Sequence, residues 1–303
     1  MEATQTLRLK FLTTKDDTMK IRQSFIEIKP TLYLVSTPIG NLEDMTFRAI
    51  ETLKKVDVIY AEDTRNSGRL LKHFDIETKL ESVHEHNQAQ KVDTMLDLLR
   101  QNKNIALISD AGMPRISDPG DLLVKACLDH DYTVVPIPGA NALTTALIAS
   151  PFQTHPFLFY GFLPAKKTQR EKALESLKTR TETLIFYEAP HRINAMLESL
   201  KTVFDDRHVC IARELTKRYE TFIDMYLSEI KDLEPLKGEM VVIVEGFKQG
   251  ETFTEDDMIE HIELLIHDGK KEMDAIKQVA KLRSMKKNDV YMAYQTHKKH
   301  FKK

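Results

Sequence analysis

Turn residues and a carboxylate follow an apolar run in the segment Ile105–Gly120, which reads IALISDAGMPRISDPG. The apolar run Ile105–Ile108 ends at Ser109 and Asp110, and the chain then turns twice through glycine and proline. A short apolar run bounded by turn residues is typical of a buried strand whose carboxyl end opens into a loop. Small ligands bind beyond the carboxyl ends of the strands in open parallel sheets. The segment therefore predicts a ligand-binding loop.

The three loops expected at strand ends contain glycine and proline but no lysine; they cover residues 37–41, 110–120 and 138–141. Neither G-x-G-x-x-G nor G-x-x-x-x-G-K-[ST] occurs in the chain. Those motifs hold phosphate at a helix N-terminus, so the loops favour a ligand with few charges that the backbone can approach closely, such as a nucleoside. S-adenosylmethionine carries no phosphate and is one candidate among several.

Acids and bases stand three or four positions apart in the strings FYEAPHR and RELTK. Glu188 and Arg192, and Glu214 and Lys217, are spaced for plain ion pairs as well as for chemistry. Asp110 has a structural alternative too, because an aspartate at a strand end often caps the following turn.

The histidines and cysteines indicate neither a metal site nor a disulfide. His84 and His86 form an H-x-H pattern without a partner cluster at ligand spacing, so a hydrogen-bonding role is favoured and no metal is expected. Cys127 and Cys210 lie far apart in sequence, which suits a reducing cytoplasm.

Length and charge allow two domains without a global preference for nucleic acid or membrane. The 303 residues are 42% hydrophobic, with a net charge of −2. No apolar run is long enough to span a bilayer. Residues 1–30 lack the apolar core of a secretory signal, so they are expected to form an N-terminal arm, or translation begins at Met19.

From residue 31 the segments that must position these loops alternate between strand-like and helix-like patterns. This alternation predicts an α/β domain with a mostly parallel sheet over residues 31–150. Asp118 and Pro119 are expected to open a helix, as N-cap and first residue. The strands and helices expected in this domain are 32–35, 47–53, 56–61, 88–100, 105–108, 133–137 and 143–149.

A turn-rich stretch at residues 150–156 marks the expected boundary to a second α/β domain over 151–250. Its expected strands are 157–162, 183–187, 209–214, 222–227 and 240–245, with helices at 167–178 and 192–204. Cys210, inside an apolar strand, is expected in the core.

A basic helical extension is expected over residues 251–303. Helices are expected at 255–267 and 274–281, with a third near Asp289. From Lys270 to Lys303 there are eleven Lys or Arg against three acids. RNA contact and simple solvation are about equally consistent with such a basic tail.

Nine strings in one order between Leu32 and Gly246 resemble the branch of the tetrapyrrole methylase family that methylates small-subunit ribosomal RNA. They are LYLVSTPIGNLEDMT, AEDTRNSGRLL, HEHN, ISDAGMPRISDPG, PIPGAN, GFLPAK, FYEAPHR, ARELTKRYE and LKGEMVVIVEG. The resemblance implies two α/β domains with S-adenosylmethionine in the cleft between them, a small helical C-terminal extension and a homodimer. It also implies methyl transfer to the ribose 2′-oxygen of a decoding-centre cytidine in 16S rRNA.

Carried over by motif, the resemblance implies a set of cofactor-binding residues. They are Pro38, Ile39, Asp110, Ala111, Gly112, Met113, Asn141, Ala142, Phe186, Tyr187 and Glu239. Phe186 and Tyr187 are adjacent on a strand, so only one of them can face the cleft. Met113 and Arg115 replace the threonine and leucine of the commoner family string, ISDAGTPLISDPG; a cofactor contact at Met113 is then expected through backbone.

Methyl transfer to a ribose hydroxyl benefits from alignment and from a nearby base. The candidate catalytic residues are therefore Glu188, Glu214 and Lys217. The candidate RNA-binding residues are Arg65, His86, Arg115, Arg192 and Arg213. Two other function classes stay open: a methyltransferase acting on a small tetrapyrrole, and a non-catalytic RNA-binding assembly factor.

Overall fold

The computed structural model describes residues 21–24, 29–84, 87–233, 235–248, 255–267, 269–282 and 285–300. The chain divides into two compact units. The first contains the described residues up to Ser150 together with Ile211–Ile223 and Lys237–Val241. The second contains Pro151–Cys210, Asp224–Leu236 and the described residues from Val242 onward.

The first unit contains a five-stranded sheet in the order β3-β2-β4-β1-β5, and every neighbouring pair is parallel. Its strands are β1 (Thr31–Val35), β2 (Val58–Ala61), β3 (Lys79–Ser82), β4 (Ile105–Ile108) and β5 (Thr133–Ile137). The helices are α1 (Phe47–Lys55), α2 (Thr64–His73), α3 (Gln88–Arg100), α4 (Asp121–Asp129), α5 (Ala142–Ala149) and the short 3-10 helix η1 (Leu42–Asp44).

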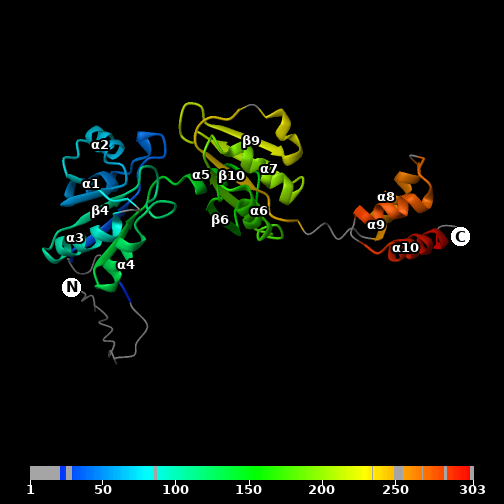
Figure 1. The fold of residues 1–303 in the computed structure, drawn as a ribbon, viewed down its shortest axis with the longest axis horizontal. Coiled ribbons are helices and arrows are strands. Elements are labelled where there is room, and N and C mark those ends of the chain that lie inside the picture. The colour runs from blue at the N-terminus through cyan, green and yellow to red at the C-terminus, as the bar shows by residue number, and fades with distance from the viewer. Residues whose placement is uncertain are drawn as a thin grey trace, which may run out of the picture. The chain divides into compact units, whose positions relative to one another are not determined.

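Alternation along the central strands builds a hydrophobic core on each face of this sheet. On β2, Ile59 and Ala61 join the core that includes residues of α1 and α2. Val58 and Tyr60, one position away, join the core that includes residues of α3 and α4. Successive side chains of a strand point to opposite faces, so both faces of a parallel sheet are apolar and are covered by helices (Figure 1).

The connections that leave β1 and β4 run to opposite faces of the sheet. The chain leaves β1 through α1 on one face and leaves β4 through α4 on the other, although β1 and β4 are neighbours. Such a switch point in an open α/β sheet opens a crevice beyond the strand carboxyl ends. The topology therefore puts the Ile105–Gly120 loop at the expected position for a ligand.

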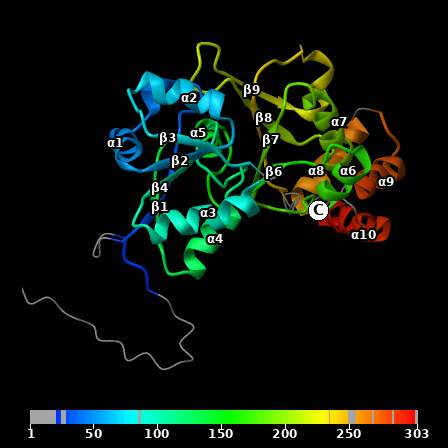
Figure 2. The same cartoon turned by 60° about the vertical axis from the view of Figure 1, so that its left-hand side comes forward.

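A second five-stranded sheet has the order β6-β7-β10-β8-β9, with β6 parallel to β7. Its strands are β6 (Phe157–Phe162), β7 (Thr183–Glu188), β8 (His208–Arg213), β9 (Thr221–Tyr226) and β10 (Met240–Val244). The strands β6, β7, β8 and β9 are labelled in Figure 2. The accompanying helices are α6 (Lys167–Glu175), α7 (Ile193–Phe204) and the 3-10 helix η2 (Leu227–Asp232). Cys210 is fully buried and, like Cys127, forms no disulfide.

The last three helices share a hydrophobic core of their own. They are α8 (Glu255–His267), α9 (Glu272–Leu282) and α10 (Lys287–His300), drawn from orange to red in Figure 1. Ile262 of α8, Ile276 and Val279 of α9, and Val290 of α10 are fully buried against one another. The helical C-terminal region expected from the sequence is thus confirmed. No described helix is both long and apolar enough to cross a membrane.

Two local features differ from the sequence-based expectations. The helix expected to open at Asp118 begins at Asp121, because Gly120 takes the N-cap position with a φ of +137° and the carboxyl of Asp118 lies near Ser109. The pair α2 and β3 was not predicted. The KLES sequence of β3 is polar and belongs to an edge strand, so it lacks the apolar run of an internal strand.

Candidate functional site

Two backbone hydrogen bonds join the loops that follow β1 and β4. The Thr37 amide donates to the Gly112 carbonyl at 2.9 Å, and the Gly112 amide donates to the Thr37 carbonyl at 3.1 Å. The hydroxyls of Thr37 and Ser109 reinforce this bridge, donating to the carbonyls of Ser109 (3.1 Å) and Gly112 (2.9 Å) respectively. The loops are therefore fixed to each other at the switch point.

The loop after β5 also meets this bridge. Gly112 has a φ of +82°, and a Cβ at this position would lie 3.2 Å from Cγ2 of Ile39 and 3.5 Å from the carbonyl oxygen of Ala140. A Cβ on Gly139 would lie 2.7 Å from the Cβ of Ser36. Glycine is favoured at position 112 by its positive φ and is needed at position 139 by the close approach of Ser36, so three strand-end loops converge on one point.

The predicted cofactor residues of these loops fall into buried and exposed groups. Ile39 and Gly112 are buried, Pro38 and Met113 are half-buried, and Asp110 and Ala111 are exposed. The Asp110 carboxylate accepts a hydrogen bond from the Asp63 amide (3.2 Å), which ties the β4 loop to the start of α2. The exposed groups are thus the ones that a ligand can reach directly.

Asn141 caps the helix that follows the third loop. Its Oδ1 atom accepts a hydrogen bond from the Thr144 amide at 3.3 Å, as an N-cap side chain does. Ala142, the first residue of α5, is half-buried. Since its side chain serves the helix, Asn141 can meet a ligand most readily through its backbone.

Carboxylates gather at the carboxyl ends of β2 and β4. Burial, together with the negative charges of Glu62 and Asp110, raises the pKa of Asp118 to about 6. Hydrogen bonds from Arg65, by contrast, lower the pKa of Asp63 to about 2. This edge of the sheet therefore carries a negative potential, which suits a cationic ligand.

The segment after β8 contacts the turn after β1. A Cβ on Gly40 would lie 2.7 Å from Cγ of Lys217 and 2.9 Å from the Leu215 carbonyl oxygen. The Lys217 ammonium pairs with Oε1 of Glu214 at 3.0 Å. The fold thus brings this predicted catalytic pair against one of the predicted ligand loops.

Glu214 has a strained backbone and a closely packed side chain. Glu214 and Thr216 have positive φ values of 53° and 66°, and the Glu214 amide donates to the Glu239 carbonyl at 3.1 Å. The carboxylate lies so close to Gly238 that a Cβ there would collide with it. Non-glycine residues at positive φ are uncommon and often occur at functional sites. The Glu239 side chain is exposed, and Arg213 donates from Nε to the Lys237 carbonyl at 3.0 Å.

The buried Glu188 forms an ion pair with the half-buried Arg192 at the end of β7. Nε of Arg192 lies 3.1 Å from Oε1 of Glu188, which also accepts the Ala189 amide at 2.9 Å. Glu188 is 2% exposed, and within the described part of the chain its Oε2 atom has no hydrogen-bond partner. Arg192 also donates to the Leu163 carbonyl, so the pair connects the ends of β6 and β7.

Phe186 and Tyr187, the two aromatic residues predicted to contact the cofactor, differ in exposure, as expected for neighbours on a strand. Phe186 is fully buried, whereas Tyr187 is half-buried and makes edge contacts with the rings of Phe159 (4.9 Å) and Phe162 (5.7 Å). Tyr187 is therefore the more accessible of the two.

Besides Arg192, two more of the predicted RNA-binding arginines form ion pairs with carboxylates. Arg65 makes a two-point contact with Asp63, at 3.1 Å and 2.9 Å. Arg115, at a φ of +71°, donates twice to Oδ1 of Asp121, at 3.0 Å and 2.8 Å. His86 lies outside the described residues.

Arg170 is a buried residue of the second unit that sequence reasoning missed. It is 4% exposed and donates to the Ser199 hydroxyl (2.9 Å) and the Ala165 carbonyl (3.0 Å). The available signal was its spacing of four from Leu174, which places both residues on one face of α6. Arg170 and Arg192 thus both donate to backbone carbonyls of the GFLPAK segment, residues 161–166.

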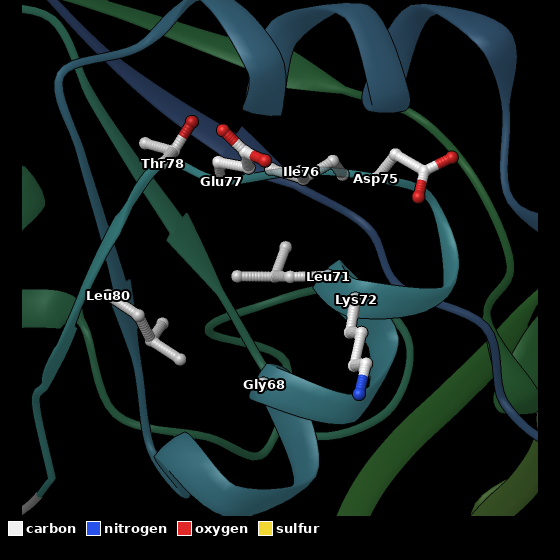
Figure 3. Close-up of a pocket in the computed structure, with 8 residues that line it drawn as sticks. All are labelled: Gly68, Leu71, Lys72, Asp75, Ile76, Glu77, Thr78 and Leu80. Carbon is white, nitrogen blue, oxygen red and sulfur yellow. The ribbon is translucent and has the colours of Figure 1, made fainter.

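A hollow of about 310 Å³ lies away from these loops, at the C-terminal end of α2 (Figure 3). Leu71, Ile76 and Leu80 supply its apolar lining, and Lys72 and Glu77 are among its polar residues. It adjoins the start of β3 and so lies at the end of the sheet opposite the strand carboxyl ends. Among the described residues no group of three His, Cys, Asp or Glu side chains could hold a metal ion.

The structure thus defines an α/β protein with two five-stranded sheets and with strand-end loops joined at the switch point of the first. The sequence profile of the Tetrapyrrole (Corrin/Porphyrin) Methylases matches residues 31–231. The chain belongs to the tetrapyrrole methylase family and, within it, to the group of ribosomal RNA small subunit methyltransferase I.

Curated relatives in that group cover most of the chain. A "Ribosomal RNA small subunit methyltransferase I" from Halalkalibacterium halodurans is 49% identical, covering 91% of this chain and 99% of that protein. The protein of the same name from Escherichia coli O157:H7 is 46% identical, covering 82% and 88%.

Solved structures support the fold. The methyltransferase CobJ is 17% identical with a TM-score of 0.55, covering 72% of this chain and 94% of that one. Diphthine synthase is 14% identical with a TM-score of 0.55, covering 71% and 90%. At these identities the likeness concerns the fold alone.

Proposed function

We propose that the chain transfers a methyl group from S-adenosylmethionine to the ribose 2′-hydroxyl of a decoding-centre cytidine in 16S rRNA. The observation that carries the proposal is the convergence of three strand-end loops, with the Glu214–Lys217 pair placed against one of them. The methyltransferase identity and the rRNA acceptor draw support from the names of relatives at 46% to 49% identity.

The residues of the loops fit this cofactor. Ser36 is 3% exposed, and within the described residues its hydroxyl has no hydrogen-bond partner, so a polar group is available below the loops. The carboxylates of Asp110 and Asp118 suit the sulfonium and ammonium charges. In this proposal Pro38, Ile39 and Met113 give apolar contact, Ala111, Asn141 and Ala142 contribute mainly backbone, and Gly112 allows the close approach that joins the loops.

The remaining cofactor roles follow the resemblance. Tyr187 is assigned to contact the cofactor and Phe186 to support it from the core, in keeping with their exposure. Glu239 has an exposed carboxylate next to the backbone bond with Glu214. We assign the methylase domains to residues 31–150 and 151–250 and the basic extension to 251–303, with residues 1–30 as an arm.

The reaction breaks the methyl carbon–sulfur bond, forms a carbon–oxygen bond at the ribose, moves the hydroxyl proton to a base and releases S-adenosylhomocysteine. No covalent bond to the enzyme is needed, so alignment supplies most of the acceleration. Glu214 is the first candidate for the base: its side chain is 21% exposed, whereas that of Glu188 is 0% exposed. Lys217 then holds the carboxylate in position, and Glu188 orients Arg192.

We assign binding of the acceptor RNA to the basic side chains named below and to the C-terminal helices. Arg65, Arg115, Arg192 and Arg213, with His86, are the proposed contacts to its backbone. For Arg65 and Arg115, binding requires exchange of an aspartate partner for a phosphate, whereas Arg192 keeps its ion pair with the buried Glu188, which orients it. In this proposal the protein acts as a homodimer in the cytoplasm, where small ribosomal subunits occur.

Transfer of labelled methyl groups tests the function. Purified protein is incubated with methyl-labelled S-adenosylmethionine and either small-subunit rRNA, assembled small subunits or a corrin precursor. We expect label in RNA and a 2′-O-methylated cytidine that is missing from cells without the gene. Label in the corrin alone would replace the RNA acceptor, and lack of cofactor binding by calorimetry would favour a non-catalytic RNA-binding factor. Asp110→Ala is expected to weaken cofactor binding; an unchanged Kd would remove Asp110 from the site.

A further inference from the structure

Two exposed aromatic side chains in the first unit each stand next to an arginine. Phe47, the first residue of α1, is 91% exposed and is followed by the exposed Arg48. Tyr219 is 68% exposed and follows Arg218, whose guanidinium lies 5.8 Å from the centre of the tyrosine ring. A single exposed aromatic residue is ordinary, but here two exposed rings each stand beside an arginine in the unit that carries the strand-end loops.

Both pairs lie at the edge of the sheet that carries the ligand loops. Phe47 begins the helix that follows the β1 loop, and the methyl group of the capping residue Thr46 would lie 3.8 Å from a Cβ on Gly139. Tyr219 belongs to the segment after β8, in which Lys217 contacts Gly40 of the same β1 loop. Phe47 thus lies one residue from a side chain that approaches the β5 loop, and Tyr219 lies two residues from a side chain that approaches the β1 loop.

The charges of these two arginines are available for a partner. Arg65, Arg115 and Arg192 each pair with a carboxylate. Across the described part of the chain, neither Arg48 nor Arg218 has a carboxylate within ion-pair distance. A guanidinium without an acid partner is free to bind phosphate, while the adjacent ring offers a flat apolar face.

We propose that Phe47 and Tyr219 are stacking platforms for unpaired bases of the acceptor RNA, with Arg48 and Arg218 binding the neighbouring phosphates. Unstacked bases of single-stranded RNA are commonly held on aromatic side chains and guanidinium planes. The inference rests on the proposed RNA acceptor and adds that the acceptor is presented as a single strand. Bases paired in a duplex cannot reach such platforms.

Binding of RNA to the full-length protein tests the platforms. Fluorescence anisotropy compares a single-stranded oligonucleotide of mixed sequence with a fully paired duplex of the same length, for wild type, Phe47→Ala, Tyr219→Ala and Tyr219→Phe. We expect each alanine variant to bind the single strand about fivefold or more weakly, since stacking contributes about 1–3 kcal/mol per base. Tyr219→Phe keeps the ring and is expected to keep the affinity. Duplex binding is expected to be the same for all four proteins.

The matched controls are Ile148→Ala, an exposed apolar residue (75%) at the far end of α5, and Arg100→Gln at the end of α3. Both are expected to bind like wild type, whereas Arg218→Gln is expected to lower the salt dependence of single-strand binding. Cofactor affinity and thermal unfolding should stay within error of wild type in all variants.

The possible outcomes distinguish a failure of the stacking-platform proposal from a failure of the proposed function. If wild type methylates RNA but the alanine variants bind single strands like the controls, the platforms are wrong and the proposed function stands. If the alanine variants change the oligomeric state and leave RNA affinity intact, the rings belong to a protein–protein contact and the proposal is overturned. If wild type neither binds nor methylates RNA, both proposals fail.

Discussion

At the scale of single residues, the fold separates arginines that have a carboxylate partner from those that do not. Arg65 and Arg115 resemble RNA contacts in sequence, yet each is bound by an aspartate only two or six positions away. Arg48 lies outside the family strings and Arg218 lies within ARELTKRYE, yet neither was predicted to bind RNA, and among the described residues neither forms an ion pair with a carboxylate. Exposure and ion pairing therefore distinguish arginines that look equivalent in the sequence.

Asp118 should make the stability of the first unit pH-dependent. Its pKa is raised to about 6 from an ordinary value near 3.9. A raised carboxyl pKa means a stabilising contribution that is fully present below the ordinary value and is lost as the pH rises through 6. Asp118→Asn removes that loss, so the variant should unfold about 2 °C above wild type at pH 8.

Thermal unfolding at a series of pH values checks this expectation. The difference between Asp118→Asn and wild type should shrink between pH 7 and pH 5 and vanish near pH 4, where wild-type Asp118 is protonated. A difference of equal size at pH 4 and pH 8 would show that the effect does not come from ionisation.

Sequence alone predicts local charge pairs, while long-range partners require the fold. The pairs Glu188–Arg192 and Glu214–Lys217 are both present, because the turns that follow β7 and β8 bring residues four and three positions apart together. The contact between Gly40 and Lys217 was not predictable, since it joins residues far apart in the chain through a close backbone approach. The same is true of the Asp110–Asp63 bond.

At the scale of elements, the strand-end loops depend on glycine where two backbones nearly touch. Gly112→Ala adds a Cβ at a φ of +82° and 3.2 Å from Ile39, beside the Thr37 bridge. Left-handed backbone costs a non-glycine residue about 1–2 kcal/mol. We expect lower thermal stability and, because the bridge is displaced, cofactor binding at least tenfold weaker by calorimetry.

Gly269→Ala is the matched control for this prediction. Gly269 has a φ of +90°, and a Cβ there would meet nothing within 4 Å. The variant carries the same backbone strain without the close contact, so it should lose stability and keep its cofactor affinity. Equal cofactor affinity in both variants would disprove the role assigned to the bridge.

Periodic and apolar elements were predictable, and their ends less so. α3 and β5 match their expected bounds, because each is strongly patterned and is followed by turn residues. The start of α4 was wrong because an Asp-Pro pair can serve a loop as well as a helix: Gly120 displaced it as the cap. β3 escaped prediction because pairing with β2, and not its own composition, makes it a strand.

At the scale of the whole molecule, the net charge of −2 hides a strongly basic segment at one end. α8, α9 and α10 form a hydrophobic core of their own. Substitution of their surface lysines can therefore test this segment in the full-length protein, and truncation is not needed. Lys271, Lys277 and Lys287 are exposed on or next to α9 and α10. They are the residues with which to test whether this segment binds RNA or is only solvated.

The triple variant Lys271→Gln, Lys277→Gln, Lys287→Gln is expected to bind RNA more weakly and with a smaller salt dependence. Each lost phosphate contact on a single strand lowers the slope of log K against log salt by about 0.7. Cofactor affinity should not change. The control exchanges the exposed Lys54, Lys55 and Lys125 of α1 and α4 for glutamine. If the two triple variants have the same RNA affinity and salt slope, the basic helices are only solvated.

The paired hydrogen bonds between Thr37 and Gly112 also reduce the conformational entropy that the loops lose when a ligand binds. Because both amides are already engaged, a ligand must be met by the next groups along each loop. The loops lose their conformational freedom when the chain folds and not when the ligand arrives. A larger share of each ligand contact then appears as affinity, which is the advantage of a preorganised site.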